Sequence, residues 1–352
     1  MEKLLIIFLL LFLSASCNLF GKTAAPAGII KTVNGGADWQ FANVYASSTS
    51  VSLASVSVSK MDFDPYNRET VFAGSYTDGL YKSTDSAAKW RKILSKISVY
   101  DFAVNPNDPK IIYAAGICVD HGCVLKTVNA GASWDSEVFH DGSAPVNAVR
   151  AIALSPSNPN QLVIGTASGS VIKSADAGLS WQLVKNFDDR VNRLLWQGGN
   201  IYVLFKTKGL FESAGFADNF VDITGSLTSS NTVANLYSSS AVSSFSQMHV
   251  DFTSPDLIYL TTNRGLYKTA DGGKNWNLIN LPVKPNQIDN HAVAIAKSSS
   301  NVVYTSVGST VYKSSDGGGT WQTQSVNAGG FINYILIDPQ LPQIAYGGVY
   351  AQ

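Results

Sequence analysis

The chain has 352 residues, of which only 14% are charged, and its 25 Lys and Arg residues balance its 25 Asp and Glu residues. Without a basic surplus or a run of like charges, nucleic acid is excluded as an expected partner. Many Gly residues and an aromatic content of 11% are typical of short strands joined by tight turns, so we expect an all-β protein.

The N-terminus has the pattern of an export signal. Residues 4–13 form an unbroken apolar run, which is too short to span a bilayer as a helix and indicates the core of a signal peptide. The next segment, residues 13–17 with the sequence LSASC, resembles the bacterial lipobox, in which small residues precede a lipidated Cys. We therefore expect a signal peptide over residues 1–17, a lipid on Cys17 and a tether over residues 18–27.

A lipid on Cys17 would make the membrane a partner and would place the protein in the periplasm or at the cell surface, because acyl chains bind strongly to bilayers. Ser14 stands where a lipobox usually has Leu, so ordinary signal-peptidase cleavage near residues 14–16 is the alternative. Both readings predict export.

An eight-residue motif recurs along the rest of the chain, about 40 to 55 residues apart. Its pattern is Ser or Thr, any residue, Asp or Asn, any residue, Gly, two residues of any type, then Trp. Six copies are present, with Ala87 at the Gly position of the second: 32–39, 83–90, 127–134, 174–181, 269–276 and 314–321. A seventh copy, Ser213 to Phe220, has lost the Asp, the Gly and the Trp.

The motif has the chemistry of a hairpin turn. Its Asp or Asn side chain can accept hydrogen bonds from backbone N–H groups ahead of it, and its Gly can adopt a positive φ. We expect the Trp ring to pack against the base of the hairpin. The residues assigned these structural roles are Asn34, Asp85, Asn129, Asp176, Asp271 and Asp316, with Trp39, Trp90, Trp134, Trp181, Trp276 and Trp321.

Each copy lies between strand-like runs, such as 265–268 before it and 277–279 after it, and two more such runs lie upstream. Four strands per repeat predict a blade of a β-propeller. Residues after Trp321 supply two strands of one more blade, and residues 28–39 supply the rest. We therefore expect residues 28–352 to form one seven-bladed β-propeller of four-stranded antiparallel blades, whose last blade is closed by the N- and C-terminal strands.

The motif resembles the Asp-box, or BNR repeat, of sialidases, sortilin-type receptors, xyloglucanases and photosystem II assembly factors. The resemblance covers nearly all of residues 28–352. It implies a propeller fold and places the boxes at the rim, where their carboxylates are structural. We therefore assign no catalytic residue to them.

Two cysteines, Cys118 and Cys123, flank a short loop between strand-like runs. An exported protein can form disulfides, so we expect a bridge between them. A metal site made from Cys118, His121 and Cys123 is the alternative, but this loop supplies too few ligands. We assign neither a metal nor a cofactor.

A ligand is expected over the central channel, on the face opposite the repeated turns. Counting back from the Pro-containing turn that ends each inner strand identifies one channel-mouth residue per blade: Ser59, Tyr100, Arg150, Asn192, His249, His291 and Asn333. The ligand-binding candidates are Tyr100, Arg150, His249, His291 and Asn333. Arg can bind a carboxylate or phosphate with two hydrogen bonds, and His can donate or accept. A water-filled channel would also favour polar residues there.

Two functions are compatible with this pattern. The first is a non-catalytic propeller, expected to be a monomer, that binds or scaffolds protein or glycan partners at the cell envelope, as sortilin-type and photosystem-assembly propellers do. The alternative is a glycoside hydrolase of sialidase or xyloglucanase type, which requires two carboxyl groups around the scissile bond. The carboxylates expected near the ligand face form no obvious pair: Asp101, Asp188, Asp189 and Asp289.

Overall fold

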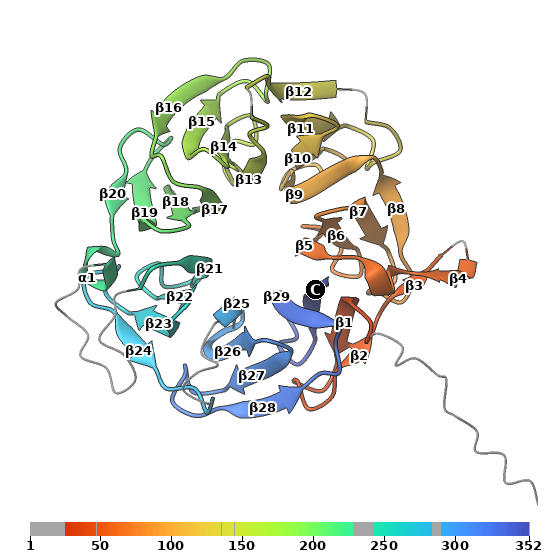
Figure 1. Ribbon diagram of the computed structural model, residues 1–352, viewed down its shortest axis with the longest axis vertical. Helices are drawn as coiled ribbons and strands as arrows, with labels where there is room; N and C mark the ends of the chain where they lie inside the picture. The colour runs from red at the N-terminus through yellow and green to blue at the C-terminus, as the bar shows by residue number, and fades with distance from the viewer. Residues whose placement is uncertain are drawn as a thin grey trace, which may run out of the picture.

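The structure is a computed structural model that describes residues 25–351, apart from 47, 135, 144, 229–241 and 284–289. Seven four-stranded antiparallel sheets stand in a ring (Figure 1), so the prediction of an all-β, seven-bladed propeller is confirmed. The predicted signal peptide, Cys17 and residues 18–24 of the tether lie outside the described residues.

In blades 1 to 6 the strands run from the centre of the ring to its rim in chain order (Figure 1). Blade 1 comprises β5 (Val58–Phe63), β6 (Val71–Ser75), β7 (Gly79–Ser83) and β8 (Arg91–Leu94). Blade 2 comprises β9 (Ile97–Val104), β10 (Ile112–Cys118), β11 (His121–Thr127) and β12 (Ser136–Asp141). Blade 3 comprises β13 (Val149–Leu154), β14 (Leu162–Thr166), β15 (Ser170–Ser174) and β16 (Gln182–Asn186).

The next three blades repeat this order. Blade 4 comprises β17 (Val191–Gln197), β18 (Asn200–Phe205), β19 (Gly209–Ala214) and β20 (Val221–Asp222). Blade 5 comprises β21 (Phe245–Val250), β22 (Ile258–Thr262), β23 (Gly265–Thr269) and β24 (Asn277–Ile279). Blade 6 comprises β25 (Asn290–Ala296), β26 (Ser299–Val307), β27 (Thr310–Ser314) and β28 (Gln322–Ser325).

Blade 7 joins the two ends of the chain, as predicted. Its strands, from the centre outward, are β29 (Gly330–Ile337), β30 (Ala345–Ala351), β1 (Gly28–Thr32) and β2 (Gln40–Phe41). The N-terminal β1 pairs with the C-terminal β30 over five residues, from Gly28 opposite Val349 to Thr32 opposite Ala345. This ladder of backbone hydrogen bonds closes the ring and leaves no open blade at the seam.

A few short elements lie outside the blades. A two-stranded hairpin, β3 (Val44–Tyr45) and β4 (Ser48–Ser52), and the 3-10 helix η1 (Leu53–Ser55) lie between blades 7 and 1. The helix α1 (Gly225–Thr228) follows blade 4. In the part of the chain that the structure describes, neither helix has the length and apolar character needed to cross a bilayer.

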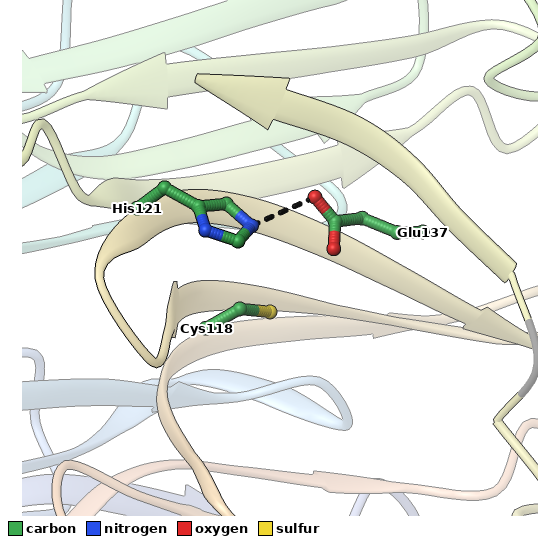
Figure 2. Close-up of side chains that lie close together, drawn as sticks. All are labelled: Cys118, His121 and Glu137. Carbon is green, nitrogen blue, oxygen red and sulfur yellow. Dashed lines mark hydrogen bonds and ion pairs between the residues drawn. The ribbon is translucent and has the colours of Figure 1, made fainter. Parts of the chain in front are cut away.

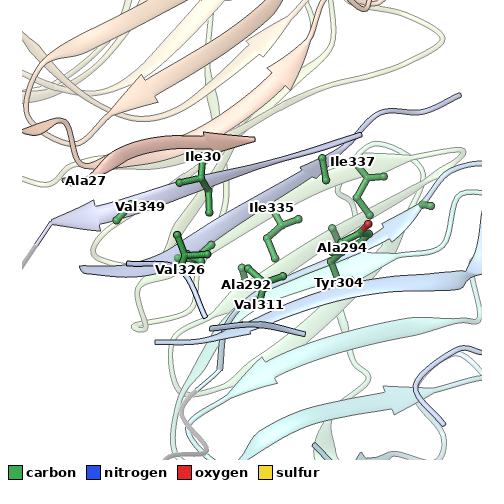
Figure 3. Close-up of a cluster of buried hydrophobic side chains, with 13 residues drawn as sticks. Ala27, Ile30, Ala292, Ala294, Tyr304, Val311, Val326, Ile335, Ile337 and Val349 are labelled. Carbon is green, nitrogen blue, oxygen red and sulfur yellow. The ribbon is translucent and has the colours of Figure 1, made fainter. Parts of the chain in front are cut away.

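The hydrophobic core lies between neighbouring blades, with one cluster at each blade interface among the described residues. Figure 3 shows the cluster between blades 6 and 7, where Ala292 and Ala294 of β25 face Ile335 and Ile337 of β29. Small residues on one inner strand opposite larger ones on the next allow the two sheets to approach closely. Each blade is therefore stabilised mainly by its neighbours.

The repeated turns form the hydrogen bonds that their sequence predicts. In the copy after β23, Thr269 Oγ1 donates to Asp271 Oδ1 at 2.7 Å and accepts from the Gly273 amide at 3.0 Å. Asp271 Oδ1 also accepts from the Asn275 amide at 2.9 Å, and Gly273 has a φ of 90°. In the worn copy, the described contacts of the Ser213 hydroxyl are long, at 3.4 Å to the Ala214 carbonyl and to the Asn219 amide.

The Trp side chains bind to the preceding blade, beyond their own hairpin. Trp90, Trp134, Trp181 and Trp276 each donate from Nε1 to a backbone carbonyl next to or within the preceding outer strand or hairpin, at 2.7–2.8 Å. The ring also lies against its own turn, as the sequence predicts, with a Trp181 ring atom 3.6 Å from the Cβ position of Gly178. In the structure the same ring fixes one blade against the previous one.

Candidate functional site

Every inner strand carries a β-bulge near its start, where the register with the second strand shifts by one residue. A bulge leaves one residue without a ladder partner and re-aims its side chain. The seven unpaired residues are Ser59, Tyr100, Arg150, Asn192, Ser246, His291 and Asn333. Six of them are the positions that the sequence assigns to the channel mouth.

His249 was assigned to the wrong place in this ring, because the equivalent residue of blade 5 is Ser246. The turn after an inner strand has two possible Pro positions, three residues apart. In blade 3 these are Pro156 and Pro159, whereas blade 5 has Phe252 at the first position and Pro255 at the second. Counting back from Pro255 therefore gives a residue three positions too late.

The backbone hydrogen bonds establish this alignment. The Ser155 amide donates to the Gln161 carbonyl in blade 3, and the Asp251 amide donates to the Leu257 carbonyl in blade 5. His249 lines the channel interior, in a cavity that Asp62 and Tyr334 also line, and it does not line the mouth. Burial lowers the pKa of His249 to about 4, so this side chain is neutral at physiological pH.

The mouth of the channel is an open cavity of about 560 Å³ on the face opposite the repeated turns. Four of the five predicted ligand-binding residues line it: Tyr100, Arg150, His291 and Asn333. The cavity is also lined by Tyr76, Thr77, Arg190, Asn192, Arg193, Lys206, Ser244, Phe245, Ser246, Gln247, Phe331 and Tyr350. None of these described residues is an Asp or a Glu.

One side of the mouth is a continuous aromatic arc contributed by four blades. The Arg150 guanidinium lies over the Tyr100 ring at 4.1 Å, and Tyr76 packs against Tyr100 with ring centroids 5.4 Å apart. The arc continues through contacts between ring centroids of 5.4, 5.0 and 4.1 Å: Tyr76–Tyr350, Phe331–Tyr350 and His291–Phe331. Aromatic faces arranged in this way bind flat or apolar groups.

The part of the mouth that adjoins this arc is basic. Arg190 donates from Nε to Asn192 Oδ1 at 2.9 Å, and Arg193 donates from Nε to Gln247 Oε1 at 2.8 Å. Arg150 Nε is buried and has no hydrogen-bond partner among the described residues. Burial lowers the pKa of Arg150, and the charges of Arg190 and Arg193 lower it further. Such a cluster, with no described carboxylate in its lining, favours an anionic ligand.

Sequence reasoning missed Arg190, Lys206 and Tyr76 as mouth residues. Tyr76 and Lys206 each follow directly after the second strand of a blade, and their amides donate to Ser57 and Arg190 carbonyls. The signal that would have found them is therefore positional. In blades 1 and 4, the residue after the second strand lines the mouth, and in blade 4 the bulge residue of the first strand lines it too.

Buried polar contacts cross the channel below the mouth. Gln247 Nε2 donates to the Asn333 carbonyl at 3.1 Å, which links blade 5 to blade 7. Deeper in the channel, Lys60 Nζ lies 2.8 Å from Asp101 Oδ1. Burial alone would lower the pKa of Lys60, but Asp101 and other neighbouring groups raise it overall. Asp101 is therefore a structural counter-ion and is not available as a free acid.

The other described residues singled out from the sequence do not line the mouth. Asp189 Oδ2 accepts from the Thr207 and Lys208 amides, both at 2.7 Å, and so caps a turn. Asp289 lies outside the described residues. Cys118 and Cys123 form a disulfide with their Cα atoms 5.8 Å apart, across the hairpin between β10 and β11.

A second open cavity of about 470 Å³ lies at the turn-side end of the channel. Asp62, Asp64 and Asp251 line it, together with His249 and Phe252. Asp64 Oδ1 accepts from the Tyr66 amide and Asp251 Oδ1 from the Thr253 amide, both at 2.9 Å. Two of these three carboxylates therefore cap turns, as Asp side chains commonly do.

The sequence matches no known protein-family model, and no curated protein is significantly similar to it. Solved structures resemble the fold. A GH74 xyloglucanase from Xanthomonas campestris has 18% identity and a TM-score of 0.67, and the match covers 84% of this chain and 51% of that one. A GH74 enzyme from Niastella koreensis has 16% identity and a TM-score of 0.66, with the same coverage.

YCF48 bound to D1 peptide has 18% identity and a TM-score of 0.60, over 84% of this chain and 92% of that one. The chain thus spans about half the length of the GH74 enzymes but nearly all of YCF48. At these identities the likeness concerns the propeller fold.

Proposed function

We propose that this protein is a non-catalytic binding propeller of the cell envelope, and that its channel mouth binds an acidic group on a protein or glycan partner. The observation that carries the proposal is the convergence of Arg150, Arg190, Arg193 and Lys206 on a cavity with no described carboxylate in its lining. A basic cluster at an open cavity favours anions. The aromatic arc beside it offers a surface for the rest of the ligand.

Two further features support a binding role. The glycosidase reaction needs a pair of carboxyl groups, and the described mouth residues supply none. YCF48, a propeller of similar length, has been solved with a D1 peptide bound. Together these features favour a peptide with an acidic group as the first ligand class to test.

The experiment compares fluorescent acidic peptides ending in a free carboxylate with the same peptides ending in an amide, alongside acidic oligosaccharides on a glycan array. A charge-assisted, two-pronged hydrogen bond contributes about 1.5–3 kcal/mol, so Arg150→Ala should weaken binding about 10- to 100-fold. The matched control is Arg91→Ala, because Arg91 is exposed on the outer strand β8. The proposal would be contradicted if Arg150→Ala left the binding affinity unchanged, or if Arg91→Ala weakened binding as much.

Glycoside hydrolysis is the second candidate function, favoured by the likeness to GH74 xyloglucanases. Three carboxylates line the turn-side cavity, and Asp62 is the one of them without a turn-capping role. Release of reducing ends from xyloglucan by wild-type protein, and its loss in Asp62→Asn, would support this function over a binding role. No release would eliminate it for this substrate.

Export and lipidation are part of the same proposal. The apolar segment 4–13 and the lipobox-like segment 13–17 support a lipid on Cys17, and the repeated turns support membership of the Asp-box group. Growth of the expressing bacterium with radioactive palmitate should label wild-type protein. Cys17→Ser should remain unlabelled, and label on that variant would show that the lipid is elsewhere.

A further inference from the structure

Blade 2 carries an exposed cluster of metal-ligating side chains away from the channel. His121 begins β11, and Glu137 and His140 lie on the neighbouring strand β12. Glu137 Oε1 lies 2.9 Å from His121 Nε2 and 2.8 Å from His140 Nδ1. Figure 2 shows the His121 ring directed at the Glu137 carboxylate, with Cys118 beside them.

A β-bulge brings these residues together. β11 and β12 pair with Cys123 opposite His140 and Leu125 opposite Glu137, and the register shifts by one residue between these pairs. Without the shift, residues three apart on a strand would point to opposite faces. The extra residue, Val138, places Glu137 and His140 on one face. From the sequence alone, the candidate metal site was the loop around His121, which has too few ligands.

The geometry points to a binding site for a zinc-like divalent transition-metal ion, with His121 Nε2, Glu137 and His140 Nδ1 as its three protein ligands. Two imidazoles and a carboxylate are a donor set that suits Zn²⁺ and leaves a further position for water. The hydrogen bonds to Glu137 Oε1 each use a proton on a ring nitrogen, and a metal ion between the three atoms would take the place of those protons.

The surroundings of the cluster match those of a built metal site. His121 Nδ1 lies 2.9 Å from Asp120 Oδ1, so a carboxylate orients the ring through its other nitrogen. This outer-sphere partner is typical of metal-ligating histidines. The His121 and His140 rings lie 3.9 Å apart between centroids, and the Cys118–Cys123 disulfide ties the start of β11 to β10. The backbone of the first ligand is therefore fixed before the ion arrives.

The two contacts to Glu137 need to open only slightly to admit an ion. Zn²⁺ with bonds of about 2.0–2.1 Å separates tetrahedral ligand atoms by about 3.3 Å, so the contacts to Glu137 would open by about half an ångström. The His140 and Glu137 side chains are 60% and 32% exposed, which leaves them room to move and gives an ion access. Cys118 Sγ is close to His121 and Glu137 but is committed to the disulfide.

The test is a calorimetric titration of the tag-free, oxidised protein with Zn²⁺, with Co²⁺ absorbance as a second readout of tetrahedral binding. Wild-type protein should bind one ion per chain. His140→Ala and Glu137→Gln should each weaken binding at least about ten-fold, and Asp120→Asn should weaken it about ten-fold through loss of ring orientation. The matched control, His291→Ala, removes a histidine from the channel mouth and should bind like wild type.

Glu137→Gln keeps the shape of the side chain, so it stays informative if His140→Ala destabilises the strand. Three outcomes would overturn the inference. One is no saturable Zn²⁺ binding by wild type, and another is an equal loss in His291→Ala. The third is binding that appears only after reduction of the disulfide, because the ligand would then be Cys118.

Discussion

The two ends of the propeller are both periodic in their backbone, but only one is periodic in its side chains. At the turn-side end, most copies repeat the same hydrogen bonds, such as those of Ser314 to Asp316 and Gly318. At the mouth, seven equivalent bulges carry Ser, Tyr, Arg, Asn, Ser, His and Asn. Repetition with satisfied polar groups indicates a role in stability, whereas variety of side chains on a repeated backbone indicates recognition.

Loss of a repeated Trp should show the stabilising role of the turn-side end most clearly. Trp90 is fully buried and its Nε1 donates to the Ala42 carbonyl at 2.8 Å. Trp90→Ala should therefore lower the free energy of unfolding by about 3–5 kcal/mol, measured by urea denaturation. Ligand binding at the mouth of the remaining folded protein should not change.

Trp39→Ala is the matched control for that variant. Trp39 occupies the same motif position, but its ring is partly exposed and its Nε1 has no hydrogen-bond partner among the described residues. The loss of stability should be clearly smaller than for Trp90→Ala. Equal losses would mean that burial and the bond to the preceding blade are not the source of the stability.

The channel between the two ends should make stability depend on pH. The pKa of His249 falls from 6.5 to about 4 on folding, so the unfolded chain binds more protons than the folded one between these values. Stability from this group is complete above pH 6.5 and is lost as the pH falls towards 4, by at most about 3 kcal/mol. Urea denaturation of wild type at pH 7 and pH 4.5 should show this loss.

His249→Gln should remove most of that pH dependence, whereas the control His291→Gln at the mouth should retain it. The carboxylates of the repeated turns affect stability in a lower range of pH. Hydrogen bonds from Ser180 lower the pKa of Asp176 to about 2, so its contribution is present above pH 3.8 and is lost below that value. Retention of the full loss between pH 7 and 4.5 in His249→Gln would show that another group titrates there.

Much of the fold follows from the sequence because each repeat contains its own signals. The turn motifs determined the number of blades, and a fixed distance to the following turn gave six of the seven bulge residues. The prediction for His249 was wrong because Pro255 occupies the second of the two possible Pro positions in the turn of blade 5. Contacts that join separate blades or neighbouring strands have no such local signal. The aromatic pair of Tyr76 and Tyr350 and the pair of His121 and Glu137 both depend on register.

Removal of a single Ser hydroxyl should cost more stability in an intact turn than in the worn one. Ser314 Oγ is buried, accepts from the Gly318 amide at 2.8 Å and donates to Asp316 Oδ1 at 2.7 Å. Ser314→Ala leaves that amide unsatisfied and should cost about 1–3 kcal/mol in urea denaturation. Ser213→Ala is the matched control, because Ser213 Oγ makes contacts of 3.4 Å only. A cost for Ser213→Ala as large as for Ser314→Ala would remove the distinction between the two turns.

The smallest change in stability is expected for a substitution of Arg150 at the mouth, in contrast to the large losses expected at the turn-side end. Arg150 gains from its contact with the Tyr100 ring at 4.1 Å, but it loses hydration, its Nε has no described partner, and Arg190 and Arg193 repel it. These effects oppose one another, so Arg150→Met should change the free energy of unfolding by less than about 1 kcal/mol.

Ionic strength provides the further test of Arg150, because salt screens repulsion between like charges. Raising the salt concentration should stabilise wild type more than Arg150→Met, as measured by urea denaturation of both proteins. A loss above about 2 kcal/mol in Arg150→Met would instead place Arg150 with the stabilising groups of the turn-side end. A near-zero change, together with loss of anion binding in Arg150→Ala, would mean that the mouth retains an unfavourable cluster of charges because a partner needs it.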